Sequence, residues 1–316
     1  MEIGSFIEMQ FPKGKEYYNQ SVDIARLNTG RSAIWHAFRV SGVKAIWIPY
    51  YQCDTVRELL LKHSAKVKFY HTDNDWNPTD LDAKKDEAVL FVNYYGIMSH
   101  KRMSELASLS EHPIIDNCQG FFCEPVAGAL NIYSCRKFVG VPDGSYVIGK
   151  GAHKYVGEYP QCYSSDTAAF LLMRIEYGCE GKGYEARHIN EQRIDTEDIM
   201  KMSKLTRTIL DGTDYEQIKQ KRRDNFDYMH NRLGGINKIN PKQYYNETTI
   251  PMVYPLVVED DGLIQRLFQG HWWSYICDEQ PKGSFEHWIS RYVIPITIDQ
   301  RYGTTELDYL IKIILR

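Results

Sequence analysis

The chain lacks the sequence features of several protein classes. It contains no run of about 18 apolar residues, so no membrane-spanning helix is expected. Its 7 cysteines are odd in number and form no C-x-x-C pair, which argues against both a disulfide framework and a zinc ribbon. It also contains no G-x-G-x-x-G or Walker A pattern, which argues against a nicotinamide or nucleoside triphosphate site.

Charge and histidine spacing exclude further classes of partner. A formal net charge of -3 gives no global basic field, so neither nucleic acid nor an acidic membrane surface is expected. The 10 histidines show no H-x-x-x-H or H-E spacing, and we expect no metal site. The first ten residues lack a basic segment followed by an apolar core, so no signal peptide is expected. Unpaired thiols then favour a reducing compartment, the cytoplasm.

Strand-like and helix-like patterns alternate through the first half of the chain. Short apolar runs predict strands, and apolar residues at helical spacing lie between these runs. Such alternation predicts the α/β class, with a mostly parallel sheet and helices on both faces. The strands are expected at residues 44–49, 66–70, 88–94 and 113–116. The helices are expected at residues 32–40, 54–63 (with Asp54 as its N-cap) and 103–109.

The second half of the chain has a different pattern, which predicts a smaller α+β domain. We expect a large α/β domain over residues 1–204 and a small domain over residues 205–316. The elements expected in this half are helices at 196–210, 214–233 and 305–315, an amphipathic segment at 262–269, and strands at 251–258 and 292–298.

Polar and aromatic residues follow the predicted strands. Ligands bind beyond the carboxyl ends of the strands in such sheets, and that edge holds Tyr50 and Tyr51, residues 93–96 and residues 116–119. Tyr51 is a candidate to stack on a flat ring, although packing at the rim of the sheet explains the same residue. Asp116 either caps the following turn or serves a ligand.

Two further segments are candidates for chemistry. Residues 27–32 (LNTGRS) open the first helix with residues that favour an N-cap, and Gly30 lets the backbone approach a ligand closely. A helix N-terminus can bind phosphate, although an ordinary capped helix explains the same residues. Lys137 follows an apolar run and precedes a Pro-Asp-Gly turn. A lysine there is commonly solvated, whereas a Schiff-base lysine needs a pKa lowered by burial or by a neighbouring cation.

The order of these segments resembles the DegT-type sugar aminotransferases, which are pyridoxal 5′-phosphate (PLP) enzymes of fold type I. Two departures are visible: Ser134 lies three residues before Lys137, where the family serine lies five before, and Ser145 replaces a glycine. The segments similar to the family's motifs are residues 28–33, 48–51, 93–96, 115–119, Lys137 with Asp143 and Gly144, 222–226, 254–256, 294–296 and 300–302.

The resemblance implies roles for particular residues. Lys137 would form the Schiff base with PLP and then move the proton, and Asp116 would hold the pyridine nitrogen. The other cofactor-binding residues that it implies are Gln119, Gly30, Arg31, Ser32, Tyr51, Ser134 and Asn93. Asn190 and Arg193 are the nearest candidates for the family's Asn-Tyr-Arg segment, which reaches the phosphate in the partner subunit.

The resemblance also implies a reaction and an assembly. It implies a homodimer that moves an amino group from an amino acid, glutamate in the family's usual reaction, to a keto-sugar that is commonly nucleotide-linked. Two alternatives remain open at this point. One is another PLP-dependent modification of a sugar, and the other is a non-catalytic member that binds a sugar nucleotide or a partner protein.

Overall fold

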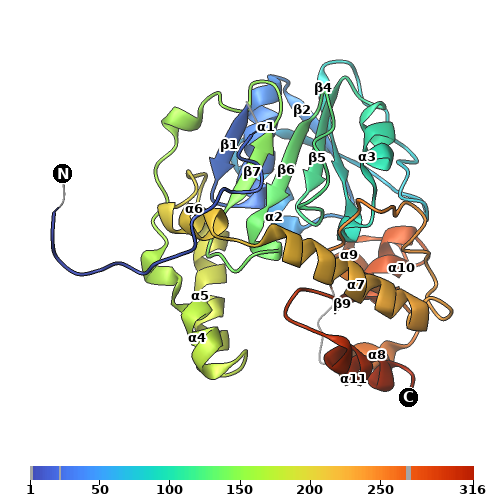
Figure 1. Ribbon diagram of the computed structural model, residues 1–316. Coiled ribbons are helices and arrows are strands. Elements are labelled where there is room, and N and C mark those ends of the chain that lie inside the picture. The colour runs from blue at the N-terminus through green and yellow to red at the C-terminus, as the bar shows by residue number, and fades with distance from the viewer. Residues whose placement is uncertain (1–2, 21–22, 268–271) are drawn as a thin grey trace.

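The computed structural model describes residues 3–20, 23–267 and 272–316. A seven-stranded sheet forms its centre (Figure 1). Strands β3, β2, β4, β5 and β6 run parallel, whereas β7 is antiparallel to both of its neighbours, β6 and β1. The predicted α/β class with a mostly parallel sheet is therefore confirmed. In sheet order, the strands are β1 (Ile24–Leu27), β7 (Ser145–Ile148), β6 (Leu130–Ser134), β5 (His112–Asn117), β4 (Glu87–Val92), β2 (Ala45–Pro49) and β3 (Lys66–Tyr70).

Several helices begin at a side chain that accepts a first-turn N–H group, as expected for an N-cap. These N-caps are Thr29, Ser99, Ser203, Asp214 and Ser284. The helices are α1 (Gly30–Ser41), α2 (Asp54–Lys62), α3 (His100–Ala107), α4 (Ala169–Tyr177), α5 (Lys182–Thr196), α6 (Lys204–Asp211), α7 (Tyr215–Leu233), α8 (Asp261–Arg266), α9 (Ile276–Glu279), α10 (Phe285–Tyr292) and α11 (Thr304–Ile314). Short 3-10 turns are η1 (Tyr94–Gly96), η2 (Cys135–Lys137), η3 (Val156–Glu158) and η4 (Ser165–Thr167).

The sheet has an apolar core on each face. All of β4 is buried, because successive side chains of a strand point to opposite faces and both faces are covered. Ala88 and Leu90 pack in the core that includes α1, whereas Val89 and Phe91 pack in the core that includes Met103 of α3. This two-sided burial explains why the strands read as short continuous apolar runs.

The C-terminal part of the chain adds a small antiparallel sheet. Its strands are β8 (Val253–Val257) and β9 (Val293–Thr297), close to the predicted ranges. Helix α11 packs beside α7, and residues of both helices share one apolar core with β8 and β9. Residues 268 and 269 of the predicted amphipathic segment lie outside the described residues, and α8 covers most of the rest. The domain boundary between residues 204 and 205 stays a prediction.

The helix predicted at residues 196–210 was wrong. Helix α5 ends at Thr196 and α6 begins at Lys204. The backbone between these helices pairs with β1 and the residue after it. Met202 N–H donates to the Arg26 carbonyl, and Met200 and Asn28 exchange hydrogen bonds. Pairing with a distant strand therefore overrides the local helical pattern.

The predicted N-cap at Asp54 was also wrong. The N-cap of α2 is Cys53, whose side chain makes no capping bond, and Asp54 is the first helical residue. Its carboxylate accepts the adjacent Thr55 N–H at 2.8 Å.

In the described ranges, no helix is both long and apolar enough to cross a membrane.

Candidate active site

Asp116 lies at the carboxyl end of β5, in the middle of the sheet. Its carboxylate is 5% exposed and accepts the Cys118 N–H at 2.9 Å and the Gln52 side-chain N–H at 3.1 Å. Gln52 follows β2, and its own carbonyl oxygen accepts the Cys53 N–H at 2.8 Å. The loops after two separate strands therefore fix the orientation of one buried carboxylate. Sequence reasoning missed Gln52, for which the only signal was its place at the carboxyl edge of the sheet.

Lys137 ends the 3-10 turn η2 directly after β6, and its side chain is exposed in the single chain. Burial raises the pKa of the Cys53 and Cys118 thiols, and the positive charge of Lys137 acts on both pKa values in the opposite direction. Asp116 lies at the carboxyl end of β5 and Lys137 follows β6, and because these neighbouring strands are parallel, both residues lie at the same edge of the sheet. Sequence reasoning did not single out Cys53 and Cys118.

The backbone of Lys137 is held from the other side by Arg222 of α7. The guanidinium of Arg222 donates to the carbonyl oxygens of Lys137 at 3.2 Å and Met252 at 2.7 Å, and lies over the Phe138 ring at 4.4 Å. Burial lowers the pKa of Arg222 to about 10, which leaves it protonated at neutral pH. The neighbouring Arg136 points away, to Glu191 of α5.

The N-terminus of α1 lies against the same region. A Cβ atom built on Gly30 would lie 2.7 Å from the Cys118 sulfur and 3.9 Å from the Ser134 Cβ, so only glycine allows this approach. The Thr29 hydroxyl caps Ser32 N–H at 3.2 Å and lies 2.8 Å from the Ser32 hydroxyl. The first N–H groups of a helix have no partner within it, which leaves them free for an anion.

Ser134 ends β6 and is 6% exposed. Its neighbour on β7 is Ser145, whose hydroxyl donates to the Thr29 carbonyl at 2.7 Å and so ties β7 to the start of α1. The structure therefore brings Gly30 and Ser134 beside Cys118, whose N–H donates to Asp116.

The side chain of Arg31 points away from this region. Its guanidinium donates to the Ile194 carbonyl and to Asp195 at 3.2 Å, both on α5. Its predicted contact with phosphate is thus available through the backbone N–H, while the side chain joins α1 to α5.

The ring of Tyr51 lies within an aromatic cluster. It is fully buried, its hydroxyl lies 2.7 Å from that of Tyr95, and its ring meets Trp273 edge-on at 4.7 Å between centroids. The residue of this loop that contacts Asp116 is Gln52. Stacking of Tyr51 on a cofactor stays a prediction.

Asn93 and Gln119 brace the loops around Asp116. The amide of Asn93 donates to Asn117 at 3.0 Å, and its carbonyl accepts the Met98 N–H at 3.1 Å. The Gln119 carbonyl oxygen accepts the Tyr95 N–H at 2.7 Å. Both side chains therefore hold the turns that follow β4 and β5, and direct contact with a cofactor stays a prediction.

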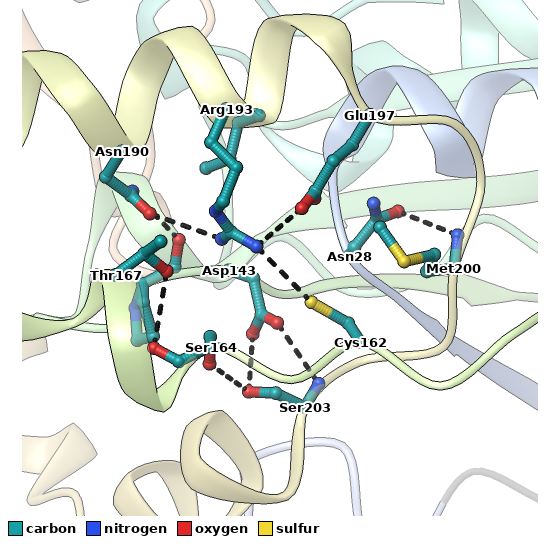
Figure 2. Close-up of polar contacts among 12 residues, drawn as sticks. Asn28, Asp143, Cys162, Ser164, Thr167, Asn190, Arg193, Glu197, Met200 and Ser203 are labelled. Atoms are coloured by element: carbon teal, nitrogen blue, oxygen red, sulfur yellow. Dashed lines mark hydrogen bonds and ion pairs between the residues drawn. The ribbon is translucent and has the colours of Figure 1, made fainter.

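Asn190 and Arg193 of α5 make contacts within their own chain (Figure 2). Arg193 donates to Glu197 at 2.7 Å and to Asn190 at 3.2 Å, and Asn190 donates to the Pro142 carbonyl at 3.3 Å. Both side chains are mostly buried, and their hydrogen bonds hold α5 against the turn that follows Lys137. Their predicted contact with a partner's phosphate stays untested.

Asp143 anchors that same turn. Its carboxylate is fully buried and accepts the Ser203 hydroxyl at 3.0 Å and the Ser203 N–H at 3.2 Å (Figure 2). It also accepts the Thr206 hydroxyl. Gly144 N–H donates to the Asn28 carbonyl at 2.6 Å. These hydrogen bonds anchor the chain on the C-terminal side of Lys137.

The residues of this region fit PLP by their chemistry. A buried carboxylate held by two donors suits a pyridinium nitrogen, and a glycine-led helix N-terminus suits a phosphate. An amine just after the neighbouring parallel strand β6 suits a Schiff base. Among the described residues, no group of three or more His, Cys, Asp or Glu side chains could hold a metal ion.

Comparison with solved structures finds the same fold. A DegT DnrJ EryC1 StrS aminotransferase from Brucella abortus is 14% identical with a TM-score of 0.64, and the match covers 94% of this chain and 86% of that protein. DesV from S. venezuelae in complex with a ketimine intermediate is 16% identical with a TM-score of 0.59, and covers 94% and 85%. The ntda protein from Bacillus subtilis with bound cofactor PMP is 12% identical with a TM-score of 0.62, and covers 93% and 73%.

The fold is therefore that of the DegT-type aminotransferases, as the sequence motifs had indicated. No protein-family model matches the chain, and no curated protein matches it by sequence.

Proposed function

We propose that the chain is a PLP-dependent aminotransferase that transfers an amino group from an amino acid to a keto-sugar. The observation that carries this proposal is that Asp116 lies at the carboxyl end of β5 and Lys137 just after the neighbouring parallel strand β6, with Gly30 at the start of α1 packed against Cys118. Two proteins of the same fold support it, because DesV is in complex with a ketimine intermediate and the ntda protein has PMP bound.

Each residue would contribute a defined step. PLP, when bound, supplies an electron sink for the carbon that loses a proton. Asp116, fixed by Gln52 and the Cys118 N–H, would keep a pyridine nitrogen protonated. The Lys137 amine would hold the cofactor and, once released, move the proton in the 1,3-shift. The N-terminus of α1 at Gly30 would bind the phosphate.

Glutamate as donor and a nucleotide-linked keto-sugar as acceptor are part of the proposal. The test is a spectral titration of the PLP-loaded protein. L-glutamate should abolish the visible absorbance of the Schiff base, and a nucleotide-linked keto-sugar should then restore it. Lys137→Ala should show no such band, while Lys150→Ala, which removes an exposed lysine just after β7, should behave like the wild type. A protein that stays colourless with excess PLP would overturn the proposal.

We also propose a homodimer, supported by apolar surface beside the site. Helices α4 and α5 project from the body of the molecule (Figure 1), and Ile175 and Ile189 on them are 80% and 62% exposed. Light scattering should give twice the chain mass. Ile175→Glu with Ile189→Glu should shift it toward the monomer, whereas Leu61→Glu on α2, where leucine is 55% exposed, should not.

Location in the cytoplasm is proposed on chemical grounds. All seven cysteines are free, and several are buried near the proposed site, which fits a reducing compartment.

A further inference from the structure

A cavity lies between the large sheet and α7. Its volume is about 210 Å³, and its lining includes no residue to which a cofactor role is assigned above. That volume far exceeds the ~10–15 Å³ that one water needs. It is below the ~300–1,000 Å³ typical of sites for drug-sized ligands. The cavity therefore suits a small metabolite rather than a nucleotide-linked sugar.

Arg223 of α7 brings an uncommitted positive charge to this cavity. Its Nε atom is buried without a hydrogen-bond partner, and no carboxylate forms an ion pair with it within residues 3–20, 23–267 and 272–316. Lys219, one turn earlier and also in the lining, is paired with Glu216 at 2.6 Å. A partly buried guanidinium without an anion is costly, so this position is suited to a ligand's carboxylate.

Two acidic residues lie at the more exposed part of the same lining. Glu124 follows the turn after β5, and Glu247 lies in the turn before β8. Both side chains are exposed, whereas Arg223 is half-buried, so the negative charge lies nearer to solvent and the positive charge deeper. This order of charges is complementary to a molecule with a carboxylate at one end and an ammonium near the mouth.

The remaining wall is partly apolar, and Tyr17, Ser99, His100, Thr248 and Thr249 add polar groups to it. Met98, Phe122 and Ile250 line the cavity, and each is buried by 95% or more. They offer surface for a hydrocarbon group. The lining thus combines an anion-binding group, cation-binding groups and an apolar wall within a small volume.

From this arrangement we propose that the cavity binds a free α-amino acid with an apolar side chain, its carboxylate on Arg223 and its ammonium toward Glu124 and Glu247. The site is separate from the Lys137 region, and the inference does not depend on the proposed function.

Titration calorimetry on the full chain tests the proposal with three probes that share one hydrocarbon skeleton. The probes are L-leucine, 4-methylpentanoate, which lacks the ammonium, and 3-methylbutylamine, which lacks the carboxylate. L-leucine should bind at least 10-fold more tightly than either. Arg223→Gln should weaken L-leucine binding roughly 10- to 100-fold, the range expected for a lost charge-assisted hydrogen bond. Lys221→Gln, an exposed change on the same helix, should leave it unchanged.

A further variant separates this site from the proposed active site. Lys137→Ala should bind L-leucine as the wild type does, even if the spectral test of the transaminase proposal fails. Equal binding by wild type and Arg223→Gln would overturn the inference. Equal binding of L-leucine and 4-methylpentanoate, or no binding of L-leucine at millimolar concentration, would also overturn it.

Discussion

Replacement of Asp143 by asparagine should destabilise the protein by about 2–3 kcal/mol. The fully buried carboxylate accepts three hydrogen bonds, from the N–H and hydroxyl of Ser203 and the hydroxyl of Thr206. A hydrogen bond to a charged group contributes about 1.5–3 kcal/mol, and a neutral one about 0.5–1.5 kcal/mol. Loss of the charge therefore weakens each bond by ~1 kcal/mol, partly offset by the lower cost of burying a neutral amide.

The assay is urea unfolding followed by tryptophan fluorescence, with the midpoint compared at an unchanged slope. Asp214→Asn is the matched control, because Asp214 caps α7 at an exposed position and asparagine caps a helix about as well. It should change stability by less than ~0.5 kcal/mol. Equal midpoints for the two variants would refute the view that Asp143 fastens the segment carrying Lys137.

Two further predictions concern residues of α1, Gly30 and His36. Gly30→Ala should cost about 1–3 kcal/mol, because its methyl group would lie 2.7 Å from the Cys118 sulfur. Cys118→Ala in the same chain should recover most of that loss in a double-mutant cycle, and strictly additive losses would contradict the clash. His36 is buried, and burial lowers its pKa. The folded state therefore binds fewer protons than the unfolded state, and the free energy of unfolding should fall as pH drops below ~6.5. His36→Gln should flatten that slope between pH 7 and 5 by up to ~1.4 kcal/mol per pH unit, whereas His188→Gln at an exposed position should not.

The sequence predicted the parts of the fold that depend on local pattern. Strand β4 is buried along its whole length, and β2 and β5 along most of theirs, and such strands can be read from a short stretch; β3, at the edge of the sheet, is only partly buried. The cap of α1 at Thr29 follows from a side chain three residues from its partner. Asp116 was a candidate because the carboxyl edge of a parallel sheet is where ligands bind.

The failures come from contacts that are distant in sequence. Residues 197–203 have helical composition, but they pair with β1 about 170 residues earlier. The side chain of Arg31 looks like a phosphate ligand beside Gly30, yet it reaches Asp195 on α5. The hydrogen bond between Gln52 and Asp116 joins two loops that are 64 residues apart, so no local sequence pattern predicts it.

The most direct test of the central claim is to map the attachment of PLP. The protein would be incubated with PLP, reduced with borohydride, digested and analysed by mass spectrometry. The account predicts a phosphopyridoxyl group on Lys137 in the wild type, and a strongly reduced yield in Asp116→Ala. A reduced adduct on a different lysine, or none at all, would contradict it.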